Sequence, residues 1–153
     1  VSHHMLMGLS EPKNTELSGA DAAIEKKMSK SKPDTAIFMT DTEKDIKRKM
    51  NKAWCPEGNI NENPIIEYFQ YIIFEKYDNI LIERPEKFGG NLDIKSIDEL
   101  KQKYENKEIH PMDLKSTCAK YINELVAPVR EHFEKDQKAK KLKEQVESFK
   151  VTR

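Results

Sequence analysis

The sequence predicts a mainly α fold of the α+β class, in which one short strand precedes a helical part that contains a single β-hairpin. Apolar residues recur at helical spacing in several segments after residue 41. Between residues 80 and 94 the pattern changes, with alternation around a turn rich in Pro and Gly. Residues 1–9 are apolar and lack a neighbouring strand, so we interpret them as a buried strand at the end of a larger sheet.

The composition is that of one charged domain with a modest core. Lys plus Arg and Asp plus Glu number 27 each among 153 residues, so the net charge selects no partner. No apolar run approaches the roughly 20 residues of a membrane helix, so we expect no membrane partner. Cys55 and Cys118 lie far apart without a CxxC pattern. They predict two free thiols in a reducing compartment, with a disulfide between them as the alternative.

The first helix is expected to begin with Asp41 or Thr42 as its cap, because acidic residues follow in the first turn. Ile46 and Met50 then recur at helical spacing, with lysines on the opposite face, until CPEGN ends the helix. Residues 10–35, which precede it, have the composition of a loop.

A second helix is expected over residues 63–77, with Asn63 as its cap and Pro64 at its first position. It is apolar nearly all round, which places it at the centre of the core. A β-hairpin with a long tip follows, its strands formed by residues 80–82 and 92–94.

Two further helices complete the predicted core. Residues 96–108 begin with a capping box formed by Ser96 and Glu99. Residues 110–133 carry a clean apolar stripe, and Pro128 is expected to kink or break this helix.

The segment KMSKS, from Lys27 to Ser31, is the first candidate for chemistry. Lys27 and Lys30 offer mobile charges, and Ser29 and Ser31 offer hydroxyl donors, as the binding of a polyphosphate requires. Met28 offers an apolar anchor for the loop. Taken alone, the segment is more often a solvated lysine run, so its neighbours in the sequence decide between the two interpretations.

Several other signatures are missing from the sequence. It contains no GxGxxG, GxxxxGK[ST], HExxH or GxSxG motif. His3 and His4 are adjacent, which suits opposite faces of a strand better than one metal site, and the other two histidines lie far along the chain. We therefore expect no protein-bound metal.

Several stretches of the sequence resemble class I aminoacyl-tRNA synthetases, specifically tyrosyl-tRNA synthetases of the archaeal and eukaryotic type. KMSKS is the second signature of that class, and it follows the segment HHMLMGL. The stretches RPEKFGG (84–90), IHPMDLK (109–115) and LVAPVREHF (125–133) carry the tyrosyl resemblance. The similarity extends from about Ser2 to Phe133.

The resemblance implies that the chain is the C-terminal half of such an enzyme. Residues 1–40 would be the end of the catalytic domain, with the last strand of a Rossmann-type sheet and the KMSKS loop. Residues 41–153 would form a helical anticodon-binding domain. The HIGH-like signature and the tyrosine pocket are not in this sequence. We therefore expect the chain alone to be inactive, and to act with an N-terminal catalytic half in a homodimeric, cytoplasmic enzyme.

ATP, bound with Mg²⁺ as a substrate, is the implied ligand of the loop. Lys27 and Lys30 would stabilise the charge that develops on the phosphates as the carboxylate of tyrosine attacks the α-phosphate. The other implied ATP-binding residues are Met28, Ser29 and Ser31 of the loop, and Met5 and Leu6 beside the adenine.

The resemblance implies tRNA(Tyr) as the partner, recognised at its anticodon. Phe88 and His110 match positions whose rings hold the first anticodon base, guanine, and Asp113 matches the carboxylate that accepts hydrogen bonds from its Watson–Crick edge. Stacking plus one directional acceptor suits an unstacked RNA base. From the residues alone, a phenylalanine on a hairpin tip more often serves packing, and His110 could simply cap a helix.

Two other functions remain open at this point, a non-catalytic tRNA-binding module and a tryptophanyl-tRNA synthetase. The opening strand argues against the module, and RPEKFGG and HPMDLK argue against the tryptophanyl enzyme. The segment from Leu9 to Lys27 is longer than in the family pattern. The tail, residues 134–149, is expected to be a charged helix whose lysines follow an RNA backbone or form a solvated face.

Overall fold

The computed structural model describes residues 4–12, 27–29 and 31–149. Within them the predicted α+β fold, mainly helical with one hairpin, is confirmed. The helices are α2 (Glu43–Lys52), α3 (Pro64–Tyr68), α4 (Ile97–Glu105), α5 (Pro111–Lys135) and α6 (Gln137–Ser148). The strands are β1 (Ile80–Ile82) and β2 (Leu92–Ile94). Three short segments are the 3₁₀-helices η1 (Pro33–Thr35) and η3 (Glu86–Phe88) and the π-helix η2 (Phe69–Ile73).

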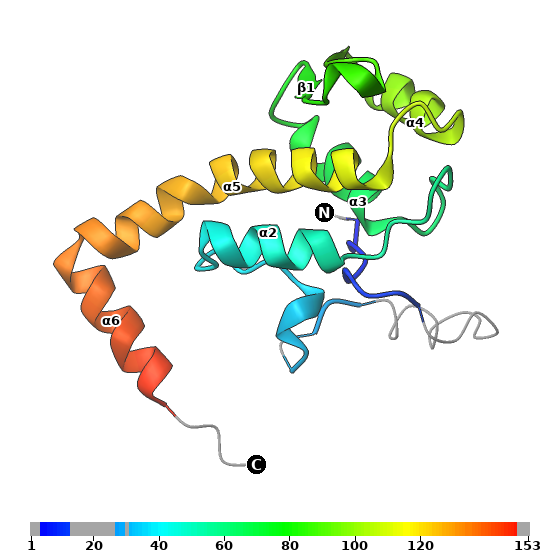
Figure 1. Cartoon of the computed structure of the whole chain (residues 1–153). Coiled ribbons are helices and arrows are strands. Elements are labelled where there is room, and N and C mark those ends of the chain that lie inside the picture. Colours follow the sequence, from blue (N-terminus) through cyan, green and yellow to red (C-terminus); the bar gives the residue numbers. More distant parts are fainter. Residues whose placement is uncertain (1–3, 13–26, 30, 150–153) are drawn as a thin grey trace.

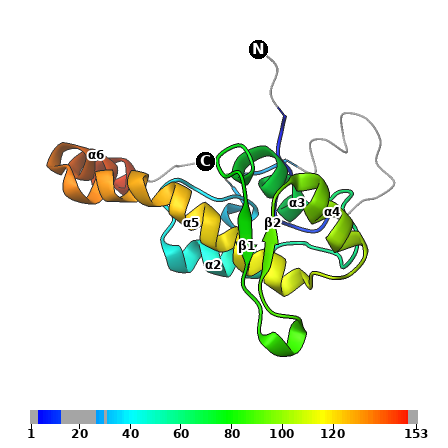
Figure 2. The same ribbon diagram turned by 90° about the horizontal axis from the view of Figure 1, so that it is seen from above.

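Helix α5 is the central helix of the fold. Helix α2 runs along one side of it, and the hairpin and α4 lie on the other side, while α6 leads away from the body (Figure 1). Seen from above, the tip between the two strands projects from the body (Figure 2). Side chains that are fully buried in the core include Ile46 and Met50 of α2, Ile65 and Phe69 of α3 and η2, and Leu114 and Cys118 of α5. Each large apolar side chain contributes about 1.5–3 kcal/mol by leaving water.

Helix α2 begins as expected, with Thr42 as its cap. The Asp45 N–H donates to Thr42 Oγ1 over 3.2 Å, and the Thr42 N–H donates to Asp45 Oδ2 over 3.2 Å, which completes a capping box. One expectation for this helix is wrong, because Lys49 does not lie on the exposed face. Its side chain is 3% exposed, and hydrogen-bond partners from the preceding segment satisfy its charge, as a buried cation requires.

The expected single helix over 63–77 is wrong beyond Tyr68. Its start is confirmed, since Asn63 Oδ1 accepts from the Ile65 N–H over 3.1 Å and Pro64 is the first helical residue. The chain then widens into the π-helix η2, where the Phe74 N–H donates to the Phe69 carbonyl over 2.9 Å. Nearly every position in the run is apolar, so its periodicity could not indicate the wider turn.

The hairpin has the expected strands in antiparallel register. Ile80 lies opposite Ile94, and Ile82 lies opposite Leu92. Ile80, Ile82 and Ile94 are fully buried, whereas Leu81 between them is exposed. This alternation packs one face of the hairpin onto the helices.

Helix α4 has a shifted capping pair and ends at Glu105, earlier than expected. Ser96 Oγ accepts from the Glu99 N–H over 3.2 Å, as predicted. The Glu99 carboxylate, however, accepts from the N–H of Lys95 over 2.9 Å, and not from that of Ser96. A glutamate that reaches one residue further still satisfies a free N–H at the helix start.

Pro128 was expected to kink or break the helix, and the break is wrong, because α5 continues through Pro128 to Lys135. Proline removes the N–H that would donate to the carbonyl of Glu124. Glu124 and Pro128 are both exposed, so water can reach that carbonyl. The break comes at Asp136, whose side chain caps α6 by accepting from the Ala139 N–H over 2.8 Å. The tail is thus a separate helix, with the expected exposed character.

The opening segment does not form the expected regular strand within residues 4–9. It makes one isolated antiparallel bridge, between Met7 and Lys27. Its other backbone bonds within the described residues go to η1, to the residue after the C-cap of α2 and to a side chain: Leu9 N to Thr35 O over 2.9 Å, Trp54 N to Leu9 O over 2.7 Å, and Met7 N to Glu67 Oε2 over 2.8 Å. A strand needs a ladder to a neighbouring strand, and these partners do not form one.

The expected loop over 10–35 ends in the 3₁₀-helix η1, and residues 13–26 and 30 lie outside the described residues. The predicted free thiols are confirmed, because Cys55 and Cys118 are both buried and unbridged. In the described part of the chain, no helix combines the length and apolar character that crossing a bilayer demands.

Candidate functional site

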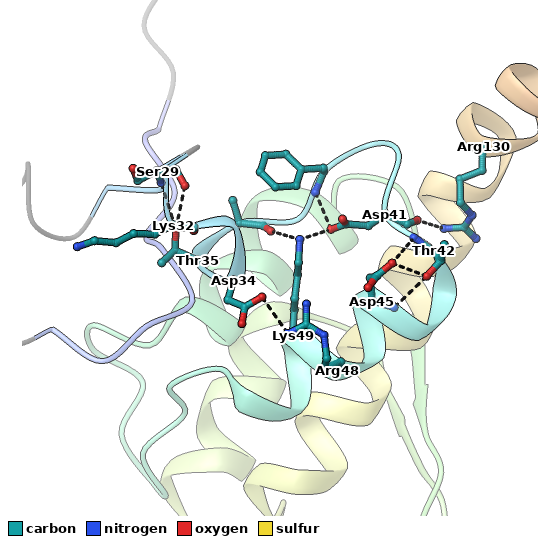
Figure 3. A network of polar contacts seen from close by, with 12 residues as sticks. Ser29, Lys32, Asp34, Thr35, Asp41, Thr42, Asp45, Arg48, Lys49 and Arg130 are labelled. Atoms are coloured by element: carbon teal, nitrogen blue, oxygen red, sulfur yellow. Dashed lines mark hydrogen bonds and ion pairs between the residues drawn. The ribbon is translucent and has the colours of Figure 1, made fainter. Parts of the chain in front are cut away.

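The KMSKS segment is closed by Thr35, a residue that sequence reasoning missed. Thr35 Oγ1 accepts from the Ser29 N–H over 3.1 Å and donates to the Lys32 carbonyl over 2.7 Å (Figure 3). The hydroxyl oxygens of Ser29 and Ser31 lie 2.8 Å apart. The one signal in the sequence is a threonine next to a Pro-Asp pair, a common turn composition.

The structure brings together the two segments that the family resemblance implies for ATP. The bridge between Met7 and Lys27 places the loop beside the stretch that holds Met5 and Leu6. Lys27 is exposed, and Met28 is partly buried against the core, which confirms Met28 as an anchor. The predicted catalytic residue Lys30 lies outside the described residues. The lysine charge and the paired serine hydroxyls form a donor set that suits phosphate oxygens.

A buried cation holds the segment that links this loop to α2. Lys49 Nζ donates to the Ala36 carbonyl over 3.0 Å and to Asp41 Oδ2 over 2.6 Å (Figure 3). It also lies 4.5 Å from the centroid of the Phe38 ring. Asp41 accepts from the Phe38 N–H over 2.9 Å as well. Residues 36–41 are therefore fixed at both ends to one side chain of α2.

The same segment is tied to α5. Arg130 Nη1 donates to the Asp41 carbonyl over 3.1 Å, and Arg130 Nη2 donates to Asn123 Oδ1 over 2.6 Å. An ion pair of 2.8 Å between Arg48 and Asp34 adds a contact from α2 to η1. The loop and the helical body are thus connected through side chains of both α2 and α5.

A second candidate site lies at the tip of the hairpin. Phe88 is 61% exposed there, so packing does not explain it. Lys87 Nζ lies 4.9 Å from the centroid of the Phe88 ring. Gly89 follows with a φ of 95°, a conformation that favours glycine and turns the chain back. An exposed ring on a tight turn is a surface on which a base can stack.

The tip is tethered to the turn before α5 by Arg84, which sequence reasoning also missed. Arg84 Nε donates to the Gly90 carbonyl over 3.0 Å, and Arg84 Nη1 donates to the Glu108 carbonyl over 2.5 Å. Glu108 lies next but one to His110 in the sequence. The structure therefore connects the stretches that carry Phe88 and His110 through one guanidinium group.

His110 caps α5, as the structural interpretation of this residue expected. Its Nδ1 accepts from the Met112 N–H over 3.2 Å, so in the neutral ring the proton is on Nε2. The side chain is nonetheless exposed, which leaves Nε2 and the ring accessible. Asp113 follows in the first turn of α5 and is half-buried. Its carboxylate has no hydrogen-bond or ion-pair partner within the described residues.

Side-chain hydrogen bonds hold the turn that leads to His110. The Glu108 carboxylate accepts from Lys103 over 3.2 Å and from Asn106 over 3.3 Å. These bonds, the one from Lys103 above all, lower the pKa of Glu108 below its usual value.

Over the described ranges, no group of three His, Cys, Asp or Glu side chains could hold a metal ion.

The comparisons with known proteins agree with the resemblance. The family model "tRNA synthetases class I (W and Y)" matches residues 15–127. The tyrosine–tRNA ligase of Thermococcus sibiricus is 44% identical over 140 residues, which are 88% of this chain and 37% of that protein. The cytoplasmic tyrosine–tRNA ligase 1 of Arabidopsis thaliana is 40% identical over 153 residues, 100% of this chain and 37% of its own length.

Solved structures give the same result. The tyrosyl-tRNA synthetase of Pyrococcus horikoshii, complexed with L-tyrosine, superposes with a TM-score of 0.78 at 38% identity. The match covers 87% of this chain and 37% of that one. The enzyme of Leishmania major, in complex with tyrosinol, gives a TM-score of 0.77 at 31% identity, over 96% of this chain and 21% of that one.

The chain spans about two fifths or less of the length of these relatives. All of them are tyrosine enzymes, which does not favour the tryptophanyl alternative. Because the family match covers most of the sequence, the chain belongs to the class I tRNA synthetases of the tryptophan and tyrosine family.

Proposed function

We propose that this chain supplies the KMSKS loop and the anticodon-binding surface of a cytoplasmic tyrosyl-tRNA synthetase. That enzyme activates tyrosine with ATP to tyrosyl-adenylate and transfers the tyrosyl group to tRNA(Tyr). In this proposal residues 1–40 complete the catalytic domain, residues 41–153 bind the anticodon, and an N-terminal catalytic half completes a homodimeric enzyme. The observation that carries it is the exposed Phe88 ring, on a hairpin tip that Arg84 ties to the turn before His110, in a chain of this family.

Recognition of the first anticodon base would use two rings and one carboxylate. Guanine would stack between Phe88 and His110, and its Watson–Crick N–H groups would donate to Asp113. The 61% exposure of Phe88 and the unpartnered carboxylate of Asp113 in the described structure support this assignment. Because Nδ1 of His110 is engaged by the helix cap, its ring is held at one orientation without losing its exposed face.

Activation of tyrosine would use the KMSKS loop. Lys27 and Lys30 would bind the phosphates of ATP, which arrives with its Mg²⁺ ion, as the tyrosine carboxylate attacks the α-phosphate and pyrophosphate leaves. Ser29 and Ser31 would donate hydrogen bonds to phosphate oxygens, in place of the contact that their hydroxyls make with each other. Met5 and Leu6 would border the adenine. The bridge between Met7 and Lys27 supports this arrangement.

The RNA-binding part of the proposal is tested with an RNA stem-loop that carries the anticodon of tRNA(Tyr). Phe88→Ala should weaken binding by about 1–3 kcal/mol, the typical contribution of one base stacked on an aromatic ring. Phe149→Ala, which removes a phenylalanine of similar exposure (65%) from the end of α6, is the matched control. Equal affinities of the Phe88 variant and the wild type would contradict the anticodon assignment.

A further inference from the structure

Arg84 is placed to control the geometry of the hairpin tip. It precedes the tip in the sequence, and its backbone N–H donates over 3.0 Å to Oδ1 of Asn91, the residue directly before β2. Its Nε donates to the Gly90 carbonyl over 3.0 Å. A Cβ atom added to Gly89 would lie 3.3 Å from Arg84 Nη2. The tip is therefore folded closely around this guanidinium group.

The other end of the guanidinium group reaches a fixed point outside the hairpin. Nη1 of Arg84 donates to the carbonyl of Glu108 over 2.5 Å. The N–H of Glu108 in turn donates to the Lys103 carbonyl over 2.9 Å, and the next residue, Ile109, is fully buried. His110 follows directly as the cap of α5. Arg84 therefore links the tip directly to the turn that leads into this helix start, in addition to the contacts that the strands make with α5.

The two bonds need arginine in particular. A guanidinium group carries donors in a planar fork, so Nε and Nη1 can serve two separate carbonyls at the same time. Lysine keeps the positive charge but concentrates its donors on one atom. Both acceptors are backbone carbonyls, so these two hydrogen bonds position the backbone and do not themselves neutralise the charge of Arg84.

We propose that Arg84 is a positioning residue that sets the spacing between Phe88 and His110, and that this spacing selects guanine at the first anticodon position. This inference rests on the proposed anticodon site and adds a specificity determinant to it. Arg84 acts through the backbone and does not contact the base. Without the guanidinium group of Arg84 both rings are still present, but the distance between them is no longer fixed. Other bases are then accepted more readily.

The test compares two RNA stem-loops that differ only in guanine or adenine at the first anticodon position. For each variant, the ratio of the two dissociation constants is measured at several salt concentrations. Arg84→Lys is expected to lower the preference for guanine about tenfold to a hundredfold, the usual effect of misplacing a recognition group. The slope of affinity against salt should stay that of the wild type, because the positive charge remains.

Arg48→Lys is the matched control. Arg48 is an arginine of α2 whose side chain is 41% exposed and which pairs with Asp34, away from the hairpin tip. Its replacement should leave the ratio of the two dissociation constants unchanged. Arg84→Gln keeps a planar donor without the charge and is expected to lose the preference as well. Thermal unfolding of each variant separates loss of selectivity from loss of the fold.

Three results would overturn the inference. In the first, Arg84→Lys keeps the full preference for guanine while Phe88→Ala loses it, so the anticodon site stands and Arg84 does not control it. In the second, the Arg84 variants bind both RNAs more weakly by the same factor, and Arg84→Gln reduces the slope of affinity against salt concentration. That result would identify Arg84 as a phosphate contact. A wild type without preference, unaffected by Phe88→Ala, would reject the proposed function and this inference together.

Discussion

Lys49 and Asp41 form an ion pair that is almost fully withdrawn from solvent, with 2.6 Å between Nζ and Oδ2 and side-chain exposures of 3% and 11%. The pair joins α2 to the segment that follows the KMSKS loop, and Arg130 of α5 binds the backbone of the same Asp41. Because a buried charge is costly without its partner, each member depends on the other. The position of the KMSKS loop is thus coupled to the helical body.

Lys49→Met is expected to destabilise the fold by about 3–5 kcal/mol, because it leaves the Asp41 carboxylate buried without its cation. Unfolding in urea, followed by circular dichroism, measures the loss. Lys52→Met, which changes an exposed lysine in the last turn of the same helix, is the control and should have a small effect. The double variant with Asp41→Asn should be less destabilised than the sum of the two single variants. Strict additivity would contradict the coupling.

Thr35→Val should loosen the KMSKS segment without unfolding the protein. The Ser29 N–H and the Lys32 carbonyl lose their hydroxyl partner, which costs about 1–3 kcal/mol locally. Hydrogen exchange of the Ser29 amide should therefore be faster by roughly tenfold or more, whereas Thr35→Ser should stay close to the wild type. Thr40→Val, at an exposed threonine, is the control. An unchanged exchange rate in Thr35→Val would show that the hydroxyl does not close the loop.

The cap of α2 makes a pH-dependent contribution to stability. Hydrogen bonds from Thr42 lower the pKa of Asp45 below its ordinary value of 3.8. Because the pKa of Asp45 is lower in the folded protein than in the unfolded chain, its carboxylate stabilises the fold fully at pH values well above 3.8. This stabilisation is lost as the pH falls through the pKa of Asp45 in the folded protein. The difference in urea midpoint between the wild type and Asp45→Asn should therefore be larger near neutral pH and shrink in acid. A difference that is constant with pH would rule out this linkage.

Both thiols should be unreactive in the folded protein. Burial raises the pKa of Cys55 and of Cys118, so little thiolate forms at mildly alkaline pH. Ellman's reagent at about pH 8 is expected to label neither cysteine in the native state and both in urea. Rapid labelling of one thiol in the native protein would show that its surroundings open.

The local features of the fold could be predicted from the sequence. The caps Asn63 and Ser96 can be predicted, and the cap of α2 can be narrowed to Asp41 or Thr42, because a capping side chain bonds a backbone N–H within three residues of itself. The hairpin can be predicted from the alternation of its strands and from the Pro- and Gly-rich turn between them. For the same reason Phe88 could be placed on a tip, although its exposure could not be predicted.

The non-local features could not be predicted. Lys49 resembles its exposed neighbours in composition, and its burial depends on carbonyl and carboxylate partners that precede the helix. Arg84 reaches Glu108 across 24 positions in the chain, and no periodicity reports such a contact.

One local feature also escapes prediction. The widening of the helix after Tyr68 occurs in a run that is apolar almost throughout, so the pattern is the same for either helix type.

Tyrosine-dependent ATP–pyrophosphate exchange tests the central claim most directly. It should be measured on this chain alone and on a mixture with the N-terminal half of a tyrosyl-tRNA synthetase. We expect exchange only in the mixture, and loss of that exchange in Lys30→Ala. Absence of exchange in the mixture, together with RNA binding that still depends on Phe88, would contradict the catalytic role of the KMSKS loop and leave an RNA-binding module.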